Sequence, residues 1–168
     1  PGPKSAPNWQ PGYGSHEVVI ESRRHVATMS QLTDEEVSLT LLAFRDRLTA
    51  LGRDDRLKFA QVFKNVGPEA GASLEHAHSQ VIATPMVPTV IQDELSASQR
   101  WFLDQGECMF CQTVATELKL GTRMVGESQN FVAFCPYASR SPYETWVLPR
   151  LHSSHFECQT RDELRRVP

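Results

Sequence analysis

The sequence is poor in cysteine, has no long apolar run and has no excess of basic residues. Four cysteines in 168 residues are too few for a disulfide-rich secreted scaffold, which favours a reducing compartment, so we expect a cytoplasmic protein. No stretch approaches the roughly 18 apolar residues of a membrane span, and the first residues lack the apolar core of a signal peptide. A formal net charge of -3 gives no reason to expect nucleic acid as a partner.

The apolar pattern predicts strands grouped around separate helices. Thr33 and Glu36 form a capping box, and the apolar residues behind them recur at a helical spacing, so we expect a helix over 34–51. Residues 89–120 are also expected to be helical, in two pieces broken near Gly106. Because strands and helices do not alternate regularly, the predicted fold class is α+β with an antiparallel sheet. The expected strands are 16–21, 59–65, 76–83, 124–128, 130–135 and 143–148.

A repeated pattern links the two ends of the chain. Glu17 is followed eight residues later by His25, Glu144 is followed by His152 at the same spacing, and the two pairs are offset by 127 residues. Unless the match is a coincidence, it predicts two tandem repeats, the first without its beginning and the second without its end. The chain is then a piece of a longer protein, as the missing initial methionine also indicates. The expected units are an irregular lead-in (1–13), the C-terminal part of the first repeat with its connecting helix (14–105) and the N-terminal part of the second repeat (106–168).

The strongest candidates for catalytic residues follow the turn at 71–73. On a strand, every second residue shares a face, so His76, His78 and Gln80 are expected to project together. The turn before them offers backbone N–H groups and a serine hydroxyl on which phosphate oxygens could dock. A neutral imidazole can attack phosphorus when a hydrogen bond holds its other nitrogen. The alternative interpretation is a pair of surface histidines on an edge strand.

This segment resembles the active-site stretch of galactose-1-phosphate uridylyltransferases, members of the histidine triad superfamily, and of the related plant-type ADP-glucose phosphorylases. A later stretch, from Pro136 to His152, resembles the start of the second repeat in the same family. The resemblance implies a histidine-triad-like antiparallel sheet with helices. Its first part is carried by Val62-Phe63-Lys64-Asn65, Gly71-Ala72-Ser73 and His76-Ala77-His78-Ser79-Gln80.

The resemblance implies a role for each matching position. His78 matches the nucleophile that becomes a nucleotidyl-histidine, and Gln80 matches the residue that hydrogen-bonds the phosphoryl oxygens of that adduct. His25 and His76 match zinc ligands, but the C-x-x-C pair that completes this site in the family would lie upstream and is not in this chain. The expected substrate-binding residues are Asn65 and Ser73, which match residues near the nucleotide and its phosphate, together with Gly71, Ala72 and Gln80.

A C-x-x-C pair, Cys108 and Cys111, has a spacing that commonly holds zinc and then requires two further ligands. His152 is the expected third ligand because the repeat makes it equivalent to His25, and His155 is the runner-up. The fourth ligand would lie near position 203, 51 residues after His152, beyond the end of this chain. A redox pair and two unremarkable helix cysteines are the alternatives.

We therefore expect a nucleotidyltransferase that moves a uridylyl group from UDP-glucose to a hexose 1-phosphate, taken as galactose 1-phosphate, through covalent nucleotidyl-His78. The amide of Gln80 does not titrate, which favours transfer to a phosphate acceptor over hydrolysis. Zinc is the expected cofactor, a nucleotide sugar and a sugar 1-phosphate are the expected partners, and the full-length protein is expected to be a homodimer. The alternatives are an ADP-glucose or dinucleoside polyphosphate phosphorylase, and a non-catalytic zinc-stapled nucleotide-binding module.

Overall fold

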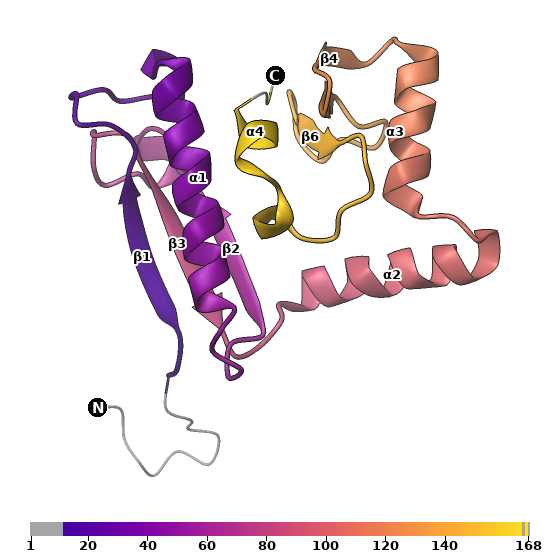
Figure 1. Cartoon of the computed structure of the whole chain (residues 1–168), viewed down its shortest axis with the longest axis horizontal. Helices are drawn as coiled ribbons and strands as arrows, with labels where there is room; N and C mark the ends of the chain where they lie inside the picture. Colours follow the sequence, from indigo (N-terminus) through magenta and orange to yellow (C-terminus); the bar gives the residue numbers. More distant parts are fainter. Residues whose placement is uncertain (1–11, 166, 168) are drawn as a thin grey trace.

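The computed structural model describes residues 12–165 and residue 167, so most of the expected lead-in over 1–13 lies outside the described residues (Figure 1). Two three-stranded antiparallel sheets form, in the orders β1-β3-β2 and β4-β5-β6, which confirms the predicted fold class. The elements are β1 (Ser15–Ile20), η1 (Met29–Gln31), α1 (Asp34–Leu51), β2 (Phe59–Phe63), η2 (Pro68–Ala70), β3 (His78–Thr84), α2 (Thr89–Gln105), α3 (Met109–Leu120), β4 (Met124–Glu127), β5 (Phe131–Phe134), β6 (Trp146–Pro149), η3 (Phe156–Cys158) and α4 (Arg161–Leu164).

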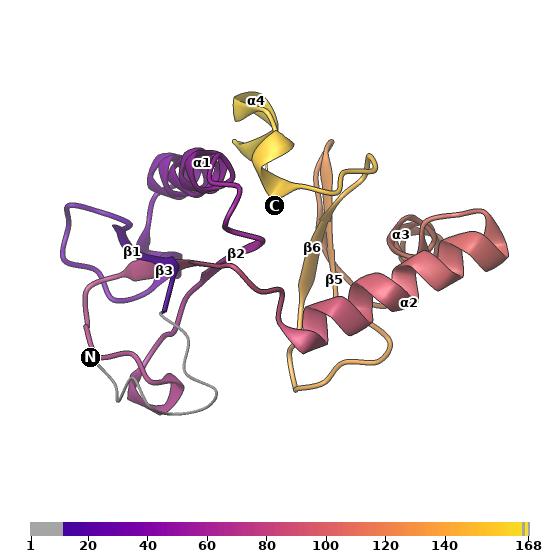
Figure 2. The same ribbon diagram turned by 90° about the horizontal axis from the view of Figure 1, so that it is seen from below.

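Helix α1 lies across one face of the first sheet, as Figure 2 shows. Glu17 on β1 binds Arg47 on α1, so Glu17 lies on the side of the sheet that faces the helix. Its pairing partner on the central strand β3 is Val81, which therefore lies on the same side and is fully buried. Directly paired residues of an antiparallel sheet lie on the same face, so His78, paired with Ile20, and Gln80 project from the opposite face. The helix thus supplies a core on one side and leaves the other side to the predicted site residues.

The second sheet has its own core under α3. Val114 of the helix packs with Val132 and Phe134 of β5, and both strand residues are completely buried. Around this cluster lie further half-buried side chains from α3, β4 and β6: Leu118, Met124, Trp146 and Leu148. The continuous apolar surface explains why β5, with all four residues buried, is the central strand of this sheet.

Helices α2 and α3 are separate, as expected from Gly106. This glycine has a φ of 73°, a left-handed conformation that ends α2 by an N–H bond to the carbonyl of Phe102. None of the residues of α2 is buried, whereas the C-terminal η3 and α4 pack against α1, and Leu164 of α4 is only 1% exposed. Figure 1 shows α4 between α1 and the second sheet. No helix in the described part of the chain is both long and apolar enough to cross a membrane.

The start of β3 differs from the prediction. The strand begins at His78 and not at His76, because the preceding residues bond to the segment after β1: Ala77 donates its N–H to the carbonyl of Val26 at 2.6 Å. The expectation that His76 projects from the same strand face as His78 and Gln80 is therefore wrong. The last strand also begins late, at Trp146, because Tyr143 has a φ of 64° and cannot continue a strand.

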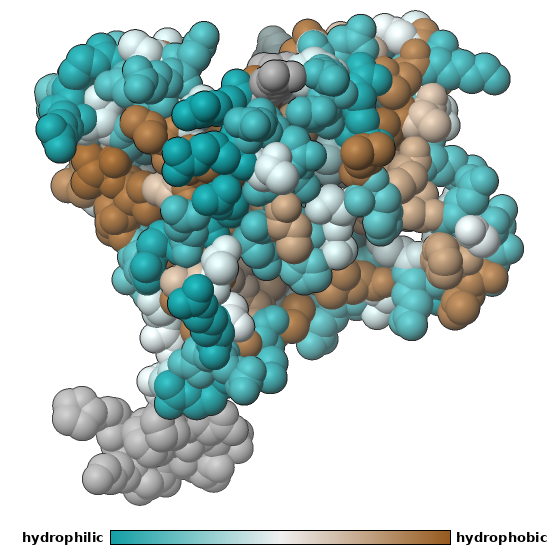
Figure 3. Space-filling view, viewed as in Figure 1, coloured by the Kyte–Doolittle hydropathy of each residue, from teal (hydrophilic) through white to brown (hydrophobic). Residues whose placement is uncertain are grey.

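Strand β1 is an edge strand among the described residues. Val18 and Ile20, on the face of β1 that points away from α1, are 52% and 57% exposed. From the α1 side, Figure 3 shows a hydrophobic area beside β1. The two glutamates of the proposed repeat have different surroundings. Glu17 binds Arg47, whereas Glu144 accepts hydrogen bonds from the backbone of Arg140 and the Trp146 indole. The repeat itself remains a prediction.

The turn between β1 and α1 is fixed by Glu36, the third residue of the helix. Its carboxylate accepts hydrogen bonds from the Arg24 guanidinium, from Ser22 Oγ at 2.6 Å and from the Thr33 N–H at 2.8 Å. The reciprocal bond from Thr33 Oγ1 completes the predicted capping box. These donors, Arg24 first, hold the pKa of Glu36 well below its ordinary value of 4.5.

We predict that Glu36→Gln lowers the melting temperature at neutral pH by about 2–4 °C, the shift typical of a small loss of stability in a domain of this size. Because the native pKa of Glu36 is depressed, its contribution is fully present above about pH 4.5 and is lost as the pH falls towards the native pKa. Melting curves from about pH 7 to pH 3 should show the difference from wild type shrinking below about pH 4. Glu35→Gln, in the same helical turn, is the matched control, and a pH-independent difference would contradict this account.

Candidate functional site

A cavity of about 520 Å³ opens where β3 begins. Its wall comes from three segments that are distant in sequence: the turn after β1, the loop after β2 and the approach to β3. The structure brings six predicted site residues onto this wall but leaves Gly71 and Gln80 off it. The six are His25, Asn65, Ala72, Ser73, His76 and His78.

His78 has the geometry of a nucleophile at this cavity. It is the first residue of β3 and only 7% exposed, and its Nδ1 lies 2.8 Å from the carbonyl oxygen of His76. A carbonyl oxygen only accepts, so Nδ1 donates and, in the neutral ring, Nε2 keeps its lone pair. The main chain thus selects the tautomer that can attack an electrophile.

Gln80 lies two residues further along β3, on the same face as His78. Its Oε1 accepts a hydrogen bond from His16 Nε2 on β1 at 2.9 Å, which leaves the amide N–H groups as donors for an anion. His16 was not predicted as a site residue. Its position depends on the β1–β3 register, which pairs Val18 with Gln80, and local sequence patterns do not specify that register.

The turn before Ser73 uses its own backbone donors. Gly71 has a φ of 80° and donates its N–H to the carbonyl of Pro68 at 2.9 Å, while Ala72 donates to Gly67 at 3.1 Å. The expectation that these two N–H groups dock phosphate is therefore wrong for this structure, because the tight turn consumes them. Ser73, exposed on the cavity wall, remains as the polar side chain of this turn.

His25 and His76 lie edge to face, with ring centroids 5.3 Å apart. His76 Nε2 is 2.8 Å from the carbonyl oxygen of Ser22, so Nε2 donates and Nδ1 is the nitrogen left to bind a metal. Within residues 12–165 and 167, no third His, Cys, Asp or Glu joins them in a metal-binding group. The histidine pair alone is an incomplete site.

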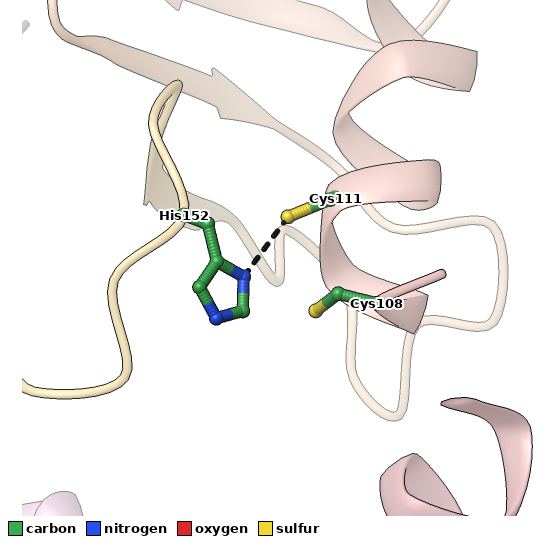
Figure 4. A group of neighbouring side chains, drawn as sticks. All are labelled: Cys108, Cys111 and His152. Carbon is green, nitrogen blue, oxygen red and sulfur yellow. Dashed lines mark hydrogen bonds between the residues drawn. The ribbon is translucent and has the colours of Figure 1, made fainter. Parts of the chain in front are cut away.

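A second cluster joins Cys108, Cys111 and His152, whose ligand atoms all lie within 4.8 Å of one another. Figure 4 shows the three side chains converging from the start of α3 and from the segment after β6, with Cys111 Sγ 3.2 Å from His152 Nδ1. Burial, together with the Cys108 thiol, raises the pKa of Cys111. Two sulfurs and an imidazole form a donor set suited to zinc.

His155, the runner-up ligand, lies elsewhere. Its Nδ1 bonds Ser154 Oγ at 2.7 Å, and it lines a separate, mainly apolar cavity of about 420 Å³ between α1 and the second sheet. That cavity holds no other predicted site residue.

The chain is similar to known proteins in both sequence and fold. The family model described as galactose-1-phosphate uridyl transferase, N-terminal domain, matches residues 5–88, half of the chain. The chain belongs to the galactose-1-phosphate uridylyltransferase family. This confirms the resemblance that the motif around His78 predicted.

Individual relatives of this family cover nearly the whole chain. ADP-glucose phosphorylase of Arabidopsis thaliana is 36% identical over 145 residues, 86% of this chain and 40% of the relative. Galactose-1-phosphate uridylyltransferase of Thermotoga maritima is 29% identical over 157 residues, 92% of this chain and 49% of the relative. The chain thus spans about half the length of these relatives.

Solved structures give the same family relation. An Arabidopsis thaliana ADP-glucose phosphorylase with bound ADP-glucose superposes with a TM-score of 0.83 at 34% identity, covering 91% of this chain and 47% of that chain. A uridylyltransferase structure superposes with a TM-score of 0.85 at 32% identity, covering 90% and 48%.

Two charged residues of this family member lie directly beside the His78 main chain and were not predicted as site residues. Glu21 was expected only as the end of a strand, and Lys64 only as part of the motif before Asn65. They are 43 residues apart, and nothing in their spacing indicates that they meet, yet Lys64 Nζ lies 2.9 Å from Glu21 Oε2.

We predict that Cys108, Cys111 and His152 bind cobalt(II) in the full gene product. Cobalt(II) serves here as a spectroscopic probe for tetrahedral sites of sulfur and nitrogen ligands. Relative to wild type, His152→Ala should bind about one ion fewer per chain and lose part of the thiolate-to-cobalt absorption, because it removes one ligand. His155→Ala is the matched control and should leave both unchanged. Metal loss in His155→Ala with full binding in His152→Ala would reverse the assignment.

Proposed function

We propose that this chain carries the nucleophilic half-site of a nucleotidyltransferase. His78 takes a uridylyl group from UDP-glucose and passes it to a hexose 1-phosphate such as galactose 1-phosphate. The observation that carries the proposal is the His78 ring itself: Nδ1 is bound to the His76 carbonyl, and the ring lies on the wall of a cavity that also presents Ser73 and Asn65. Relatives named as galactose-1-phosphate uridylyltransferases support the choice of substrates.

The chemistry follows from the two ring nitrogens of His78. Nε2 attacks the α-phosphorus of UDP-glucose, and an N–P bond forms as the P–O bond to the β-phosphate breaks. The electron pair leaves on oxygen with glucose 1-phosphate, which needs no proton to depart. The ring becomes cationic, and its Nδ1–H, held by the His76 carbonyl, is stabilised by that oxygen.

The second displacement is the reverse of the first. A phosphate oxygen of the incoming hexose 1-phosphate attacks the same phosphorus, the N–P bond breaks, and its electron pair returns to Nε2. Gln80 offers amide N–H groups to the phosphoryl oxygens but has no group that deprotonates water at neutral pH. Transfer is therefore favoured over hydrolysis.

We further propose that Cys108, Cys111 and His152 hold zinc, with the fourth ligand outside this chain. When bound, the metal cross-links the start of α3 to the segment after β6. His25 and His76 would contribute to a second zinc ion whose remaining ligands also lie outside this chain. The division into two repeats near residue 106, the homodimer and the cytoplasmic location stay predictions.

A phosphorylase acting on ADP-glucose is the second candidate, favoured by the 36% identity to Arabidopsis thaliana ADP-glucose phosphorylase. The His78 step would be the same, with an adenylyl group on Nε2. The acceptor would be inorganic phosphate, which attacks phosphorus as the hexose 1-phosphate does. The two functions thus differ in base and acceptor and share the nucleophile.

We predict that the full gene product, incubated with UDP-glucose labelled at the α-phosphate, carries acid-labile label on His78. His78→Asn should abolish this label and lower exchange of label between UDP-glucose and glucose 1-phosphate by about 10³-fold or more, because the nucleophile is lost. His155→Asn, a histidine of the other cavity, should label as wild type does. Label that persists in His78→Asn would refute the assignment.

The choice between the two candidates is predicted to follow the base and the acceptor. For a uridylyltransferase, uridylyl-enzyme should form faster than adenylyl-enzyme, and galactose 1-phosphate should discharge it faster than inorganic phosphate. Rapid-quench measurement of adduct decay with each acceptor gives both preferences. Faster formation from ADP-glucose and faster discharge by inorganic phosphate would establish the phosphorylase instead.

A further inference from the structure

A buried ion pair lies on the helix-facing side of β3, directly behind His78. Lys64 Nζ is 2.9 Å from Glu21 Oε2, and the side chains are only 16% and 0% exposed, which makes this the most deeply buried ion pair in the described part of the chain. Ser79 donates its hydroxyl to the other carboxylate oxygen at 2.5 Å. The Lys64 ammonium also donates to the backbone carbonyl of His78 at 3.0 Å.

The ion pair lies where β3 is hydrogen-bonded to β1 but not to β2. Strand β1 pairs with β3 from the first residue of β3, in the Ile20–His78 pair, but β2 pairs with β3 only from Gln80 onward, two residues after His78. Lys64 is the first residue after β2, where the chain departs to form the cavity wall. Its ammonium supplies the donor to the His78 carbonyl at the position where the strand has stopped supplying backbone donors.

Charge and burial explain why all three groups are needed together. A buried carboxylate is tolerated when it is paired and hydrogen-bonded, as Glu21 is by Lys64 and Ser79. Because Glu21 neutralises Lys64, the pair adds no net charge to the cavity that Lys64 and His78 both line. The pair is therefore suited to hold the main chain and unsuited to attract the phosphates of a substrate.

We propose that Glu21 and Lys64 are positioning residues for the His78 nucleophile, an inference that rests on the proposed function. The His78 carbonyl is held by Lys64, which the Glu21 carboxylate holds in turn. The preceding peptide is held by a backbone bond, from the Glu21 N–H to the Ala77 carbonyl at 3.2 Å, that does not depend on the ion pair. The main chain of the nucleophile is thus fixed on both sides of its Cα. A displacement of about 1 Å in a reacting group costs about 10²-fold in rate, so loss of the pair slows attack on phosphorus.

The test is the single-turnover rate of uridylyl-His78 formation in the full gene product at saturating UDP-glucose. We expect Lys64→Met to lower this rate about 10- to 100-fold, with the half-saturating UDP-glucose concentration unchanged within about twofold. Lys64→Arg, which keeps a cationic donor, should restore most of the rate. Arg47→Met breaks the more exposed ion pair between Arg47 and Glu17 of the same sheet and should leave the rate at the wild-type value.

The double variant Glu21→Gln/Lys64→Met separates positioning from folding. It leaves no unpaired buried charge, so its melting temperature should recover from that of Lys64→Met towards wild type, while its rate stays low. Recovery of the rate together with stability would overturn the inference, because the pair would then only stabilise the fold.

The remaining outcomes also decide the question. A rise in the half-saturating concentration at an unchanged rate in Lys64→Met would make Lys64 a substrate-binding residue and overturn the positioning role. An unchanged rate and concentration would overturn the inference alone. If wild type forms no adduct on His78, the proposed function fails and the inference fails with it.

Discussion

The site depends on how one strand, β3, begins. At His78 the strand is still paired with β1, but β2 has already turned away to form the loop at 64–68. This divergence opens the cavity beside His78, and it would leave the His78 carbonyl oxygen without a backbone donor. A lysine side chain satisfies that oxygen, and a buried carboxylate neutralises the lysine. The cavity beside His78 and the contact of Lys64 with the His78 carbonyl both occur at this break in pairing.

Each of the two sheets holds one group of candidate site residues. The first sheet is closed by α1 on one face and presents His78 and Gln80 from the other, so its apolar core and these two candidate site residues do not compete for the same surface. The second sheet packs under α3 and brings a C-x-x-C pair to the histidine that follows β6. The three candidate metal ligands therefore lie at the ends of elements that the second core positions.

Features determined by nearby residues could be predicted from the sequence. The capping box at Thr33, the helix break at Gly106 and the C-x-x-C pair all act within a few residues. The start of β3 could not be predicted, because bonds to a segment about 50 residues away, such as the one from Ala77 to Val26, remove His76 from the strand. Tyr143 adopts a left-handed conformation that its residue type disfavours, so β6 begins late. The meeting of Glu21 and Lys64 depends on strand register, which local periodicity does not encode.

The packing of α4 on α1 has a consequence for the order in which the chain acquires structure. Leu164 is almost fully buried, and its helix α4, which begins at Arg161, packs against α1, which begins at Asp34. During synthesis the first sheet and α1 can pair soon after they emerge, but this surface of α1 stays uncovered until η3 and α4 follow. Contacts of such high sequence separation close late and slowly. A nascent chain therefore passes through a stage in which α1 presents apolar surface to chaperones and to other chains.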